Sequence, residues 1–181
     1  MITRILQIFG FVSFLASLIA CSEETKNDKA TTIDLSQASN ETPDDLGASF
    51  LMAVKNNDSK YIETFFPSVA DVAEIMNSYE GNEEEKKQIL NNSDKNTKDI
   101  RRNALHSIEE IKNKGSKNAI DWKDVAFSTS ELSTRKENNI EFAKLVIYFN
   151  SGSSLYKMEI PECIKSDRGW LIFDKPKWIG K

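Results

Sequence analysis

The sequence predicts an α+β domain in which N-terminal helices pack on one face of a curved, four-stranded antiparallel sheet. Three observations lead to this fold class. Between residues 43 and 114 the apolar residues recur at intervals of three and four, which is typical of helices. After Gly115 they alternate with polar residues, which is typical of strands. Short runs rich in Gly, Ser, Asn and Asp separate the alternating segments and indicate hairpin turns.

Helix start signals occur three times in the first part of the domain. Thr42 is followed by a proline and then by Asp45, so a capping box is expected at the start of the first helix. Asp58 is expected to cap a second, short helix. Ser68 begins a third helix, where Asp71 stands in position to close another capping box.

The remaining helical segments differ in the strength of their pattern. Residues 82–92 begin with glutamates, which suit a helix N-terminus, but contain few apolar residues and predict a helix only weakly. A long helix is expected from about Thr97 to Lys114, with Gly115 as its stop. The residues that form the apolar face of this helix are Ile100, Ala104, Ile108 and Ile111.

The sheet is expected to be a meander. Residues 119–132 predict its first strand, and residues 139–150 predict a central strand covered twice, because apolar residues occupy both of its faces. Pro161 cannot donate to a strand ladder, so the third strand lies at an edge or is bulged there. The last strand is expected at 170–173, followed by a tail that trails off and is held by Trp178.

This order of elements, with the ending DRGWLIFDKPKW at 167–178, resembles the NTF2-like (cystatin-like) lipoproteins of unknown function found in bacteria. The resemblance covers residues 43–181. It implies helices packed into the concave side of a bent sheet, often around a pocket. Enzymes of that superfamily commonly use Asp/His or Tyr/Asp pairs in the pocket, and no such pair can be mapped onto this chain.

Aromatic residues of the sheet are the candidates for lining a pocket, because ligand sites combine apolar walls with a few polar tips. The residues expected at such a pocket are Trp122, Tyr148, Tyr156 and Trp170. The alternative is that they only fill the core beneath the helices. Either way, the polar ends of Trp122 and of the two tyrosines need hydrogen-bond partners if they are buried.

The N-terminus carries a second resemblance. Leu18-Ile19-Ala20-Cys21 ends an apolar segment and resembles the lipobox of bacterial lipoproteins. It implies that residues 1–20 are a signal peptide and that Cys21 becomes the lipidated first residue of a membrane-attached protein. The apolar segment is shorter than the roughly 20 residues of a spanning helix, which also favours a signal. Ser22 is not the Asp that retains many such proteins at the inner membrane, so an outer-membrane location facing the periplasm is expected.

Composition restricts the remaining possibilities. Residues 21–42 are polar and predict a flexible tether between the lipid and a single domain at 43–181. The net charge is −4 at pH 7, which argues against a nucleic-acid partner. With Cys21 lipidated, Cys163 is left alone and is expected to be a buried thiol, although an intermolecular disulfide and a reactive thiol remain as alternatives.

Neither a cofactor site nor a metal site is predicted. His106 is the only histidine, so a His-based metal cluster cannot form within one chain, and its helical position is on the wet face, away from the apolar stripe. No nucleophile elbow of the Gly-x-Ser-x-Gly type occurs. No catalytic residue is therefore assigned.

Three functions fit these observations. The first is a non-enzymatic, lipid-anchored binding module of the cell envelope. The second is an envelope structural or assembly factor that binds a protein partner through the basic, Trp-containing segment at 175–181. The third is an NTF2-like enzyme acting on a small substrate. The strand predicted at 139–150 has apolar residues on both faces. A homodimer that packs on one face would explain this pattern, and a helix that covers that face explains it equally well.

Overall fold

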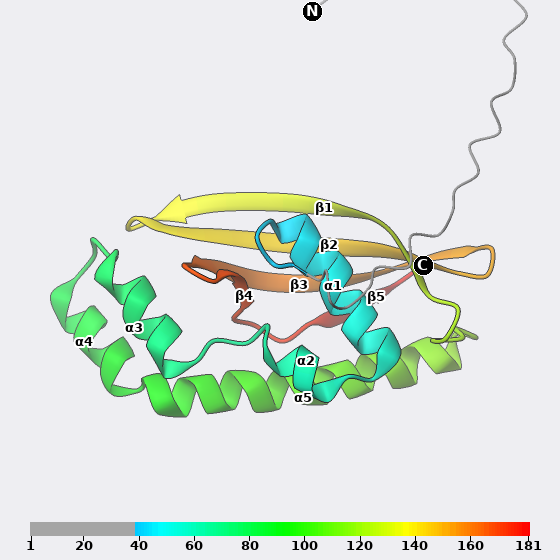
Figure 1. Ribbon diagram of the computed structural model, residues 1–181, viewed down its shortest axis with the longest axis horizontal. Coiled ribbons are helices and arrows are strands. Elements are labelled where there is room, and N and C mark those ends of the chain that lie inside the picture. The colour runs from blue at the N-terminus through cyan, green and yellow to red at the C-terminus, as the bar shows by residue number, and fades with distance from the viewer. Residues whose placement is uncertain (1–38) are drawn as a thin grey trace, which may run out of the picture.

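The computed structural model describes residues 39–181, in which helices precede an antiparallel sheet (Figure 1). The α+β class predicted from the sequence is therefore confirmed. The helices are α1 (Pro43–Asn56), α2 (Ser59–Glu63), α3 (Val69–Asn77), α4 (Glu83–Asn91) and α5 (Ser93–Lys117). The strands are β1 (Ala126–Glu137), β2 (Ile140–Ser151), β3 (Ser154–Ser166), β4 (Gly169–Ile172) and β5 (Lys177–Gly180). The predicted signal peptide, Cys21 and most of the tether lie outside the described residues.

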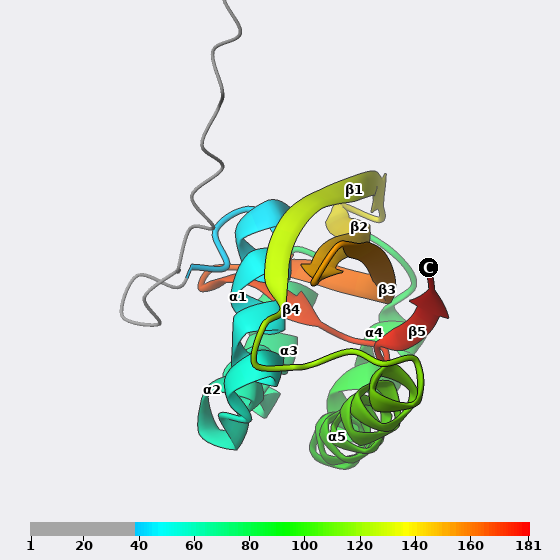
Figure 2. The ribbon, with the colours of Figure 1, turned by 90° about the vertical axis from the view of Figure 1, so that its right-hand side faces the viewer.

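The sheet is an open meander in the order β1-β2-β3-β4, and β5 also pairs with β3. β4 pairs with residues 163–166 of β3 and β5 with residues 157–159, so these two short strands follow one another along the same edge of β3. β1 pairs with β2 alone and forms the opposite edge of the sheet. Figure 2 shows the sheet curving over α1, with α5 running beneath it.

The expected capping boxes are present. The Thr42 hydroxyl accepts the Asp45 N–H while the Asp45 carboxylate accepts the Thr42 N–H, and Ser68 and Asp71 repeat this arrangement at α3. Asp58 accepts from the N–H of Tyr61 and so caps α2 as predicted. The weakly predicted segment at 82–92 is also helical, because the Asn82 side chain accepts the N–H groups of residues 84 and 85 at the start of α4.

The long helix extends further than its periodicity predicts. α5 begins at Ser93 rather than near Thr97 and ends at Lys117, so the prediction that Gly115 stops it is wrong. Gly115 serves packing instead: a Cβ there would lie 2.5 Å from Cζ2 of Trp122, so only glycine lets the indole approach the helix. No helix in the described part of the chain is long and apolar enough to span a membrane.

The first predicted strand is partly wrong. Residues 119–125 form a connection outside the sheet, and β1 starts only at Ala126. Ile120, Trp122 and Val125 are buried in the main hydrophobic core from this connection. Alternating burial can therefore arise in an irregular segment, since it reflects which side chains reach the core and not whether the backbone joins a ladder.

The C-terminal tail does not trail off. Residues 177–180 form β5 on β3, and Trp178 lies with its ring centroid 5.9 Å from that of Tyr156 and 6.3 Å from that of Phe149. The expectation that Trp178 pins the tail is confirmed. Because the segment is part of the sheet and contacts the core, removal of residues 175–181 would disturb the fold and would not test a partner-binding tail cleanly.

Two hydrophobic clusters form in the described region. The larger one lies between the sheet and helices α1 and α5. The smaller one lies at one end of the sheet, and its buried members are Val72, Ile75, Met76, Ile140 and Ile164.

Both faces of the sheet are covered at that end. Ala143 and Cys163 pair across β2 and β3 and belong to the larger cluster, whereas their chain neighbours Phe142 and Ile164 pair and belong to the smaller one. Successive residues of a strand face opposite sides, so both sides are packed here. Further along β2, Tyr148 is only half-buried. The prediction that both faces of β2 are covered is therefore correct at one end of the strand only.

Candidate functional site

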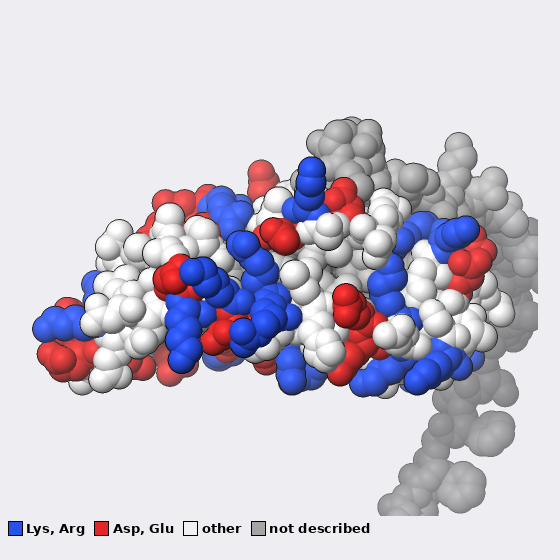
Figure 3. Space-filling view, turned by 90° about the horizontal axis from the view of Figure 1, so that it is seen from below, with Lys and Arg blue, Asp and Glu red and all other residues white. Residues whose placement is uncertain are grey.

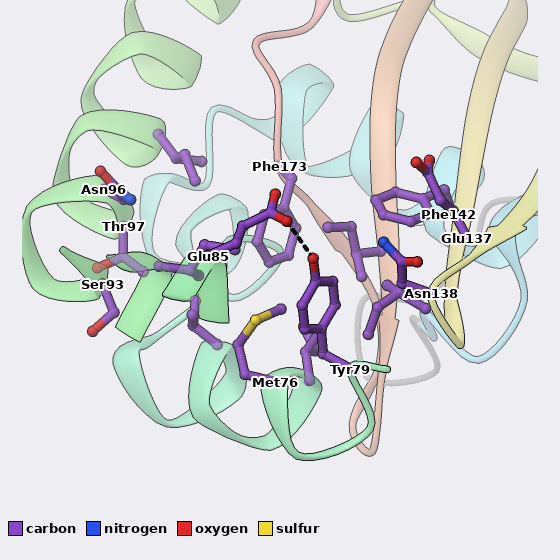
Figure 4. A pocket seen from close by; sticks show the side chains of 16 residues that line it. Met76, Tyr79, Glu85, Ser93, Asn96, Thr97, Glu137, Asn138, Phe142 and Phe173 are labelled. Atoms are coloured by element: carbon purple, nitrogen blue, oxygen red, sulfur yellow. Dashed lines mark hydrogen bonds between the residues drawn. The ribbon is translucent and has the colours of Figure 1, made fainter. Parts of the chain in front are cut away.

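An apolar cavity of about 310 Å³ lies at the end of the domain beneath α3 and α4 (Figure 4). The start of α5 and the β1–β2 hairpin complete its walls. Apolar side chains from α3 and the sheet form one continuous part of the wall, namely Val72, Ile75, Met76, Ile140, Phe142 and Ile164. Its volume is at the lower end of the roughly 300–1,000 Å³ of small-molecule pockets. The cavity is thus large enough for a small ligand.

The α3 wall follows from local sequence. Val72, Ile75 and Met76 are spaced three and four residues apart, so they share one face of α3, and Tyr79 follows in the connection just after the helix ends at Asn77. The capping box at Ser68 fixes where α3 begins and therefore which face turns toward the sheet. The same apolar stripe that predicts a helix thus becomes a cavity wall.

Arg168, in the β3–β4 turn, fixes the start of α3 against the rest of the domain. Its Nε donates to Asp71 Oδ1 at 2.6 Å and its Nη2 to Asp71 Oδ2 at 2.9 Å. The guanidinium also donates to the carbonyl oxygens of Thr64 and Phe66, both at 2.9 Å. Burial alone would raise the pKa of Asp71, but the hydrogen bonds from Arg168 and Ser68 outweigh it and lower that pKa.

Polar groups at the cavity are already hydrogen-bonded to the protein. Tyr79, in the connection after α3, donates its hydroxyl to the Glu85 carboxylate of α4, and this hydrogen bond raises the pKa of Tyr79 (Figure 4). Ser93 donates its hydroxyl to the Leu90 carbonyl, and Thr97 donates to the carbonyl of residue 94. The cavity therefore offers apolar contact over most of its wall, and hydrogen bonding at the Tyr79–Glu85 pair and at the side-chain amides of Asn96 and Asn138.

Helix α4 is a thin cover over this cavity. None of its residues is buried, and Ile89 and Leu90 are its half-buried apolar residues. Ile89 lines the cavity, whereas Leu90 packs on the smaller cluster beside it. Little apolar surface therefore holds α4 on the domain, which is typical of segments that open locally.

The four aromatic residues predicted to line a pocket lie elsewhere. Trp122 and Tyr156 stack on either side of Phe149 in the larger cluster, each with centroids 5.9 Å apart. Their polar ends have the expected partners: Trp122 Nε1 donates to the Lys112 carbonyl at 3.0 Å and the Tyr156 hydroxyl to the Asn118 carbonyl at 3.1 Å. Trp122 and Tyr156 therefore fill the core, which was the alternative to lining a pocket.

Trp170 and Tyr148 also stand apart from the cavity. Trp170 is buried in the larger cluster, with Lys165 Nζ 5.5 Å from its ring centroid. Tyr148 is half-buried, and a hydrogen bond to Glu131 raises its pKa. Neither is among the residues that line the cavity. Sequence periodicity identified the α3 stripe but not its partner surface, because long-range contacts of α3 with β2 and β3 have no local signal.

Groups with reactive potential are separated from the cavity. His106 is exposed as predicted, with Nε2 3.4 Å from Glu110 Oε1 on the next turn of α5. Cys163 is fully buried, and desolvation, assisted by the Glu162 carboxylate, raises the pKa of its thiol. Within residues 39–181, no group of three or more His, Cys, Asp or Glu side chains is arranged to hold a metal ion.

A polar groove of about 390 Å³ adjoins the cavity along α5. The two share Asn96, Ile100 and Phe173, and the groove adds Asp99 and Lys175 among its other residues. Seen from below, the surface on the α5 side carries Lys and Arg interspersed with Asp and Glu (Figure 3). Such mixed charge is typical of a solvated helix face.

Comparison with known proteins gives no assignment: no family model matches the chain, and neither a curated protein nor a solved structure is significantly similar to it. The cavity and its surroundings are therefore the basis for a functional proposal.

Proposed function

We propose that this protein is a non-enzymatic, lipid-anchored binding module of the cell envelope, and that the cavity beneath α3 and α4 holds a small, largely apolar ligand. The observation that carries the proposal is the cavity itself: about 310 Å³ with walls that are apolar over most of their area. A fully packed domain end would leave no space of this size, because protein interiors have few voids larger than a water molecule.

The packing around the cavity supports this function. The Arg168 contacts and the capping box hold α3 in place, and the paired strands β2 and β3 hold the opposite wall. Among the helices in the described part of the chain, α4 is the one without a buried residue. A site with two firm walls and one weakly held cover can admit a ligand without unfolding the domain.

The test is native mass spectrometry of residues 22–181 purified gently from the periplasm. This segment keeps both hydrophobic clusters and the hydrogen bonds of Ser39 and Asn40 to the domain. A reproducible added mass of small-molecule size is expected. Its absence, together with no binding of any apolar probe in titration, would refute the proposal.

Matched variants place the ligand. Ile89→Trp would fill the cavity from its weakest wall and is expected to remove the added mass. Leu90→Trp is the control, because Leu90 is the next residue on α4, is half-buried like Ile89 and does not line the cavity. Equal loss in both variants would show that the effect comes from disturbing α4 and not from occupying the cavity.

The anchoring part of the proposal rests on Cys21 and the lipobox-like residues before it. Two or more acyl chains attach a protein stably to a bilayer, since each buried CH₂ contributes about 0.8 kcal/mol. Replacement of Cys21 by Ala in the full chain is expected to release the protein from the membrane fraction. Unchanged membrane association on cell fractionation would refute lipid anchoring through this residue, and would leave the cavity proposal intact.

A further inference from the structure

The charges at the cavity have one sign. Glu85 and Glu137 are the charged residues among those that line it, and no lysine or arginine is present in that set. Figure 4 shows Glu85 reaching from α4 toward Tyr79, and Glu137 on the opposite wall beside Phe142. The charged groups that a ligand head meets among the lining residues are therefore carboxylates alone.

One cation stands behind this wall, and it is shared. Arg135 Nη2 lies 2.8 Å from Glu162 Oε2, while Arg135 Nε lies 3.9 Å from Glu137 Oε2. One guanidinium therefore serves two carboxylates, so Arg135, Glu137 and Glu162 together carry net negative charge. The guanidinium also sits 4.3 Å from the centroid of the Phe142 ring, so one face of this ring is already occupied by a cation of the protein.

The adjoining groove does not reverse this balance. Its charged residues are Asp99, Asp174 and Lys175. Arg102, which is not in the groove lining, pairs with Asp99 at 2.8 Å on the exposed side of α5. A carboxylate or phosphate head placed in this groove would find one lysine facing two aspartates, which gives it no net attraction.

We infer that the ligand of this cavity is a single-chain amphiphile with an ammonium head, whose apolar part fills the space beneath α3 and α4 and whose head lies at Glu85 and Glu137. The inference rests on the proposed function, because it assigns a ligand class to that same cavity. An amine or quaternary ammonium gains Coulomb attraction at these carboxylates, and the ring of Tyr79 can add cation–π contact. An anionic head would lose its hydration beside like charges, which disfavours it.

The experiment compares three probes of matched chain length on residues 22–181: decyltrimethylammonium, decanoate and decanol. Isothermal titration calorimetry is run below their micelle concentrations at about pH 7.5, where decanoate is ionised. We expect the ammonium probe to bind at least about tenfold more tightly than decanoate, with decanol between them. Thermal melting of each variant first shows that it is folded.

Charge-removing variants assign the preference to the proposed head site. Glu85→Gln with Glu137→Gln is expected to abolish the difference between the ammonium and carboxylate probes while leaving decanol affinity unchanged. Glu109→Gln with Glu110→Gln is the control, because these carboxylates lie on the exposed face of α5 away from the cavity, and it should keep the full preference.

The outcomes distinguish failure of the head-group inference from failure of the proposed function. If decanol binds but decanoate matches or exceeds the ammonium probe, the head-group inference is overturned and the cavity remains a ligand site. A preference that survives the Glu85 and Glu137 changes also overturns it. If none of the three probes binds, both this inference and the proposed function fail.

Discussion

Replacement of Arg168 by Ala tests whether the contacts of the β3–β4 turn hold α3, and with it one wall of the cavity. The change removes two hydrogen bonds to the Asp71 carboxylate and one each to the carbonyls of Thr64 and Phe66. The Asp71 side chain is only 10% exposed, so it would keep Ser68 as its remaining partner in a poorly hydrated position.

The expected loss can be worked from these contacts. Removal of one partner of a fully buried ion pair costs about 3–5 kcal/mol. The Arg168 side chain is 44% exposed, so solvent screens part of the interaction and the estimate falls to about 2–3 kcal/mol of unfolding free energy. Arg101→Ala is the matched control: its side chain is also 44% exposed, but its partner Glu63 is 47% exposed at 3.8 Å, so less than about 1 kcal/mol is expected.

The assay is urea unfolding followed by far-UV circular dichroism, repeated across acid pH. Because the pKa of Asp71 is lowered in the folded state, its stabilisation is complete above the unfolded value of about 4 and is lost as pH falls through the folded pKa. The difference between wild type and Arg168→Ala should therefore shrink toward about pH 2. A loss equal to that of Arg101→Ala, or one that stays constant with pH, would contradict this account of how α3 is held.

Three further outcomes are expected. Gly115→Ala should lower the unfolding free energy by about 1–3 kcal/mol, because the new Cβ would lie 2.5 Å from the Trp122 ring, and an unchanged urea midpoint would refute the close packing. Cys163 should react with Ellman's reagent only in denaturant, since the thiol is fully buried and its pKa is raised; rapid labelling of the folded protein would contradict this. Tyr79→Phe should speed probe exchange in stopped-flow measurements while changing stability by less than about 1 kcal/mol, because it removes the hydroxyl link to Glu85 on the thin α4 cover; an unchanged exchange rate would show that this link does not control access.

Local signals in the sequence were enough for most of the helix starts. Capping boxes act over four residues, so the starts of α1 and α3 could be read from Thr42 and Ser68 directly. The end of α5 could not be predicted in this way. The role of Gly115 depends on Trp122, which packs against the helix from the connection that follows it. The same connection imitates a strand in its periodicity, which is why the first strand was placed too early.

Local patterns are enough to predict the α+β class and the order of helices and strands, and the residues before Cys21 predict a lipid anchor. The tertiary structure alone decided where space remains. Whether an apolar stripe is filled or left as a wall depends on which surface faces it, and the α3 stripe meets β2 and β3 across some 70–90 residues of chain. Two of the four aromatic residues expected at a pocket, Trp122 and Tyr156, instead stack on Phe149 in the core, and Phe149 fills the space between them.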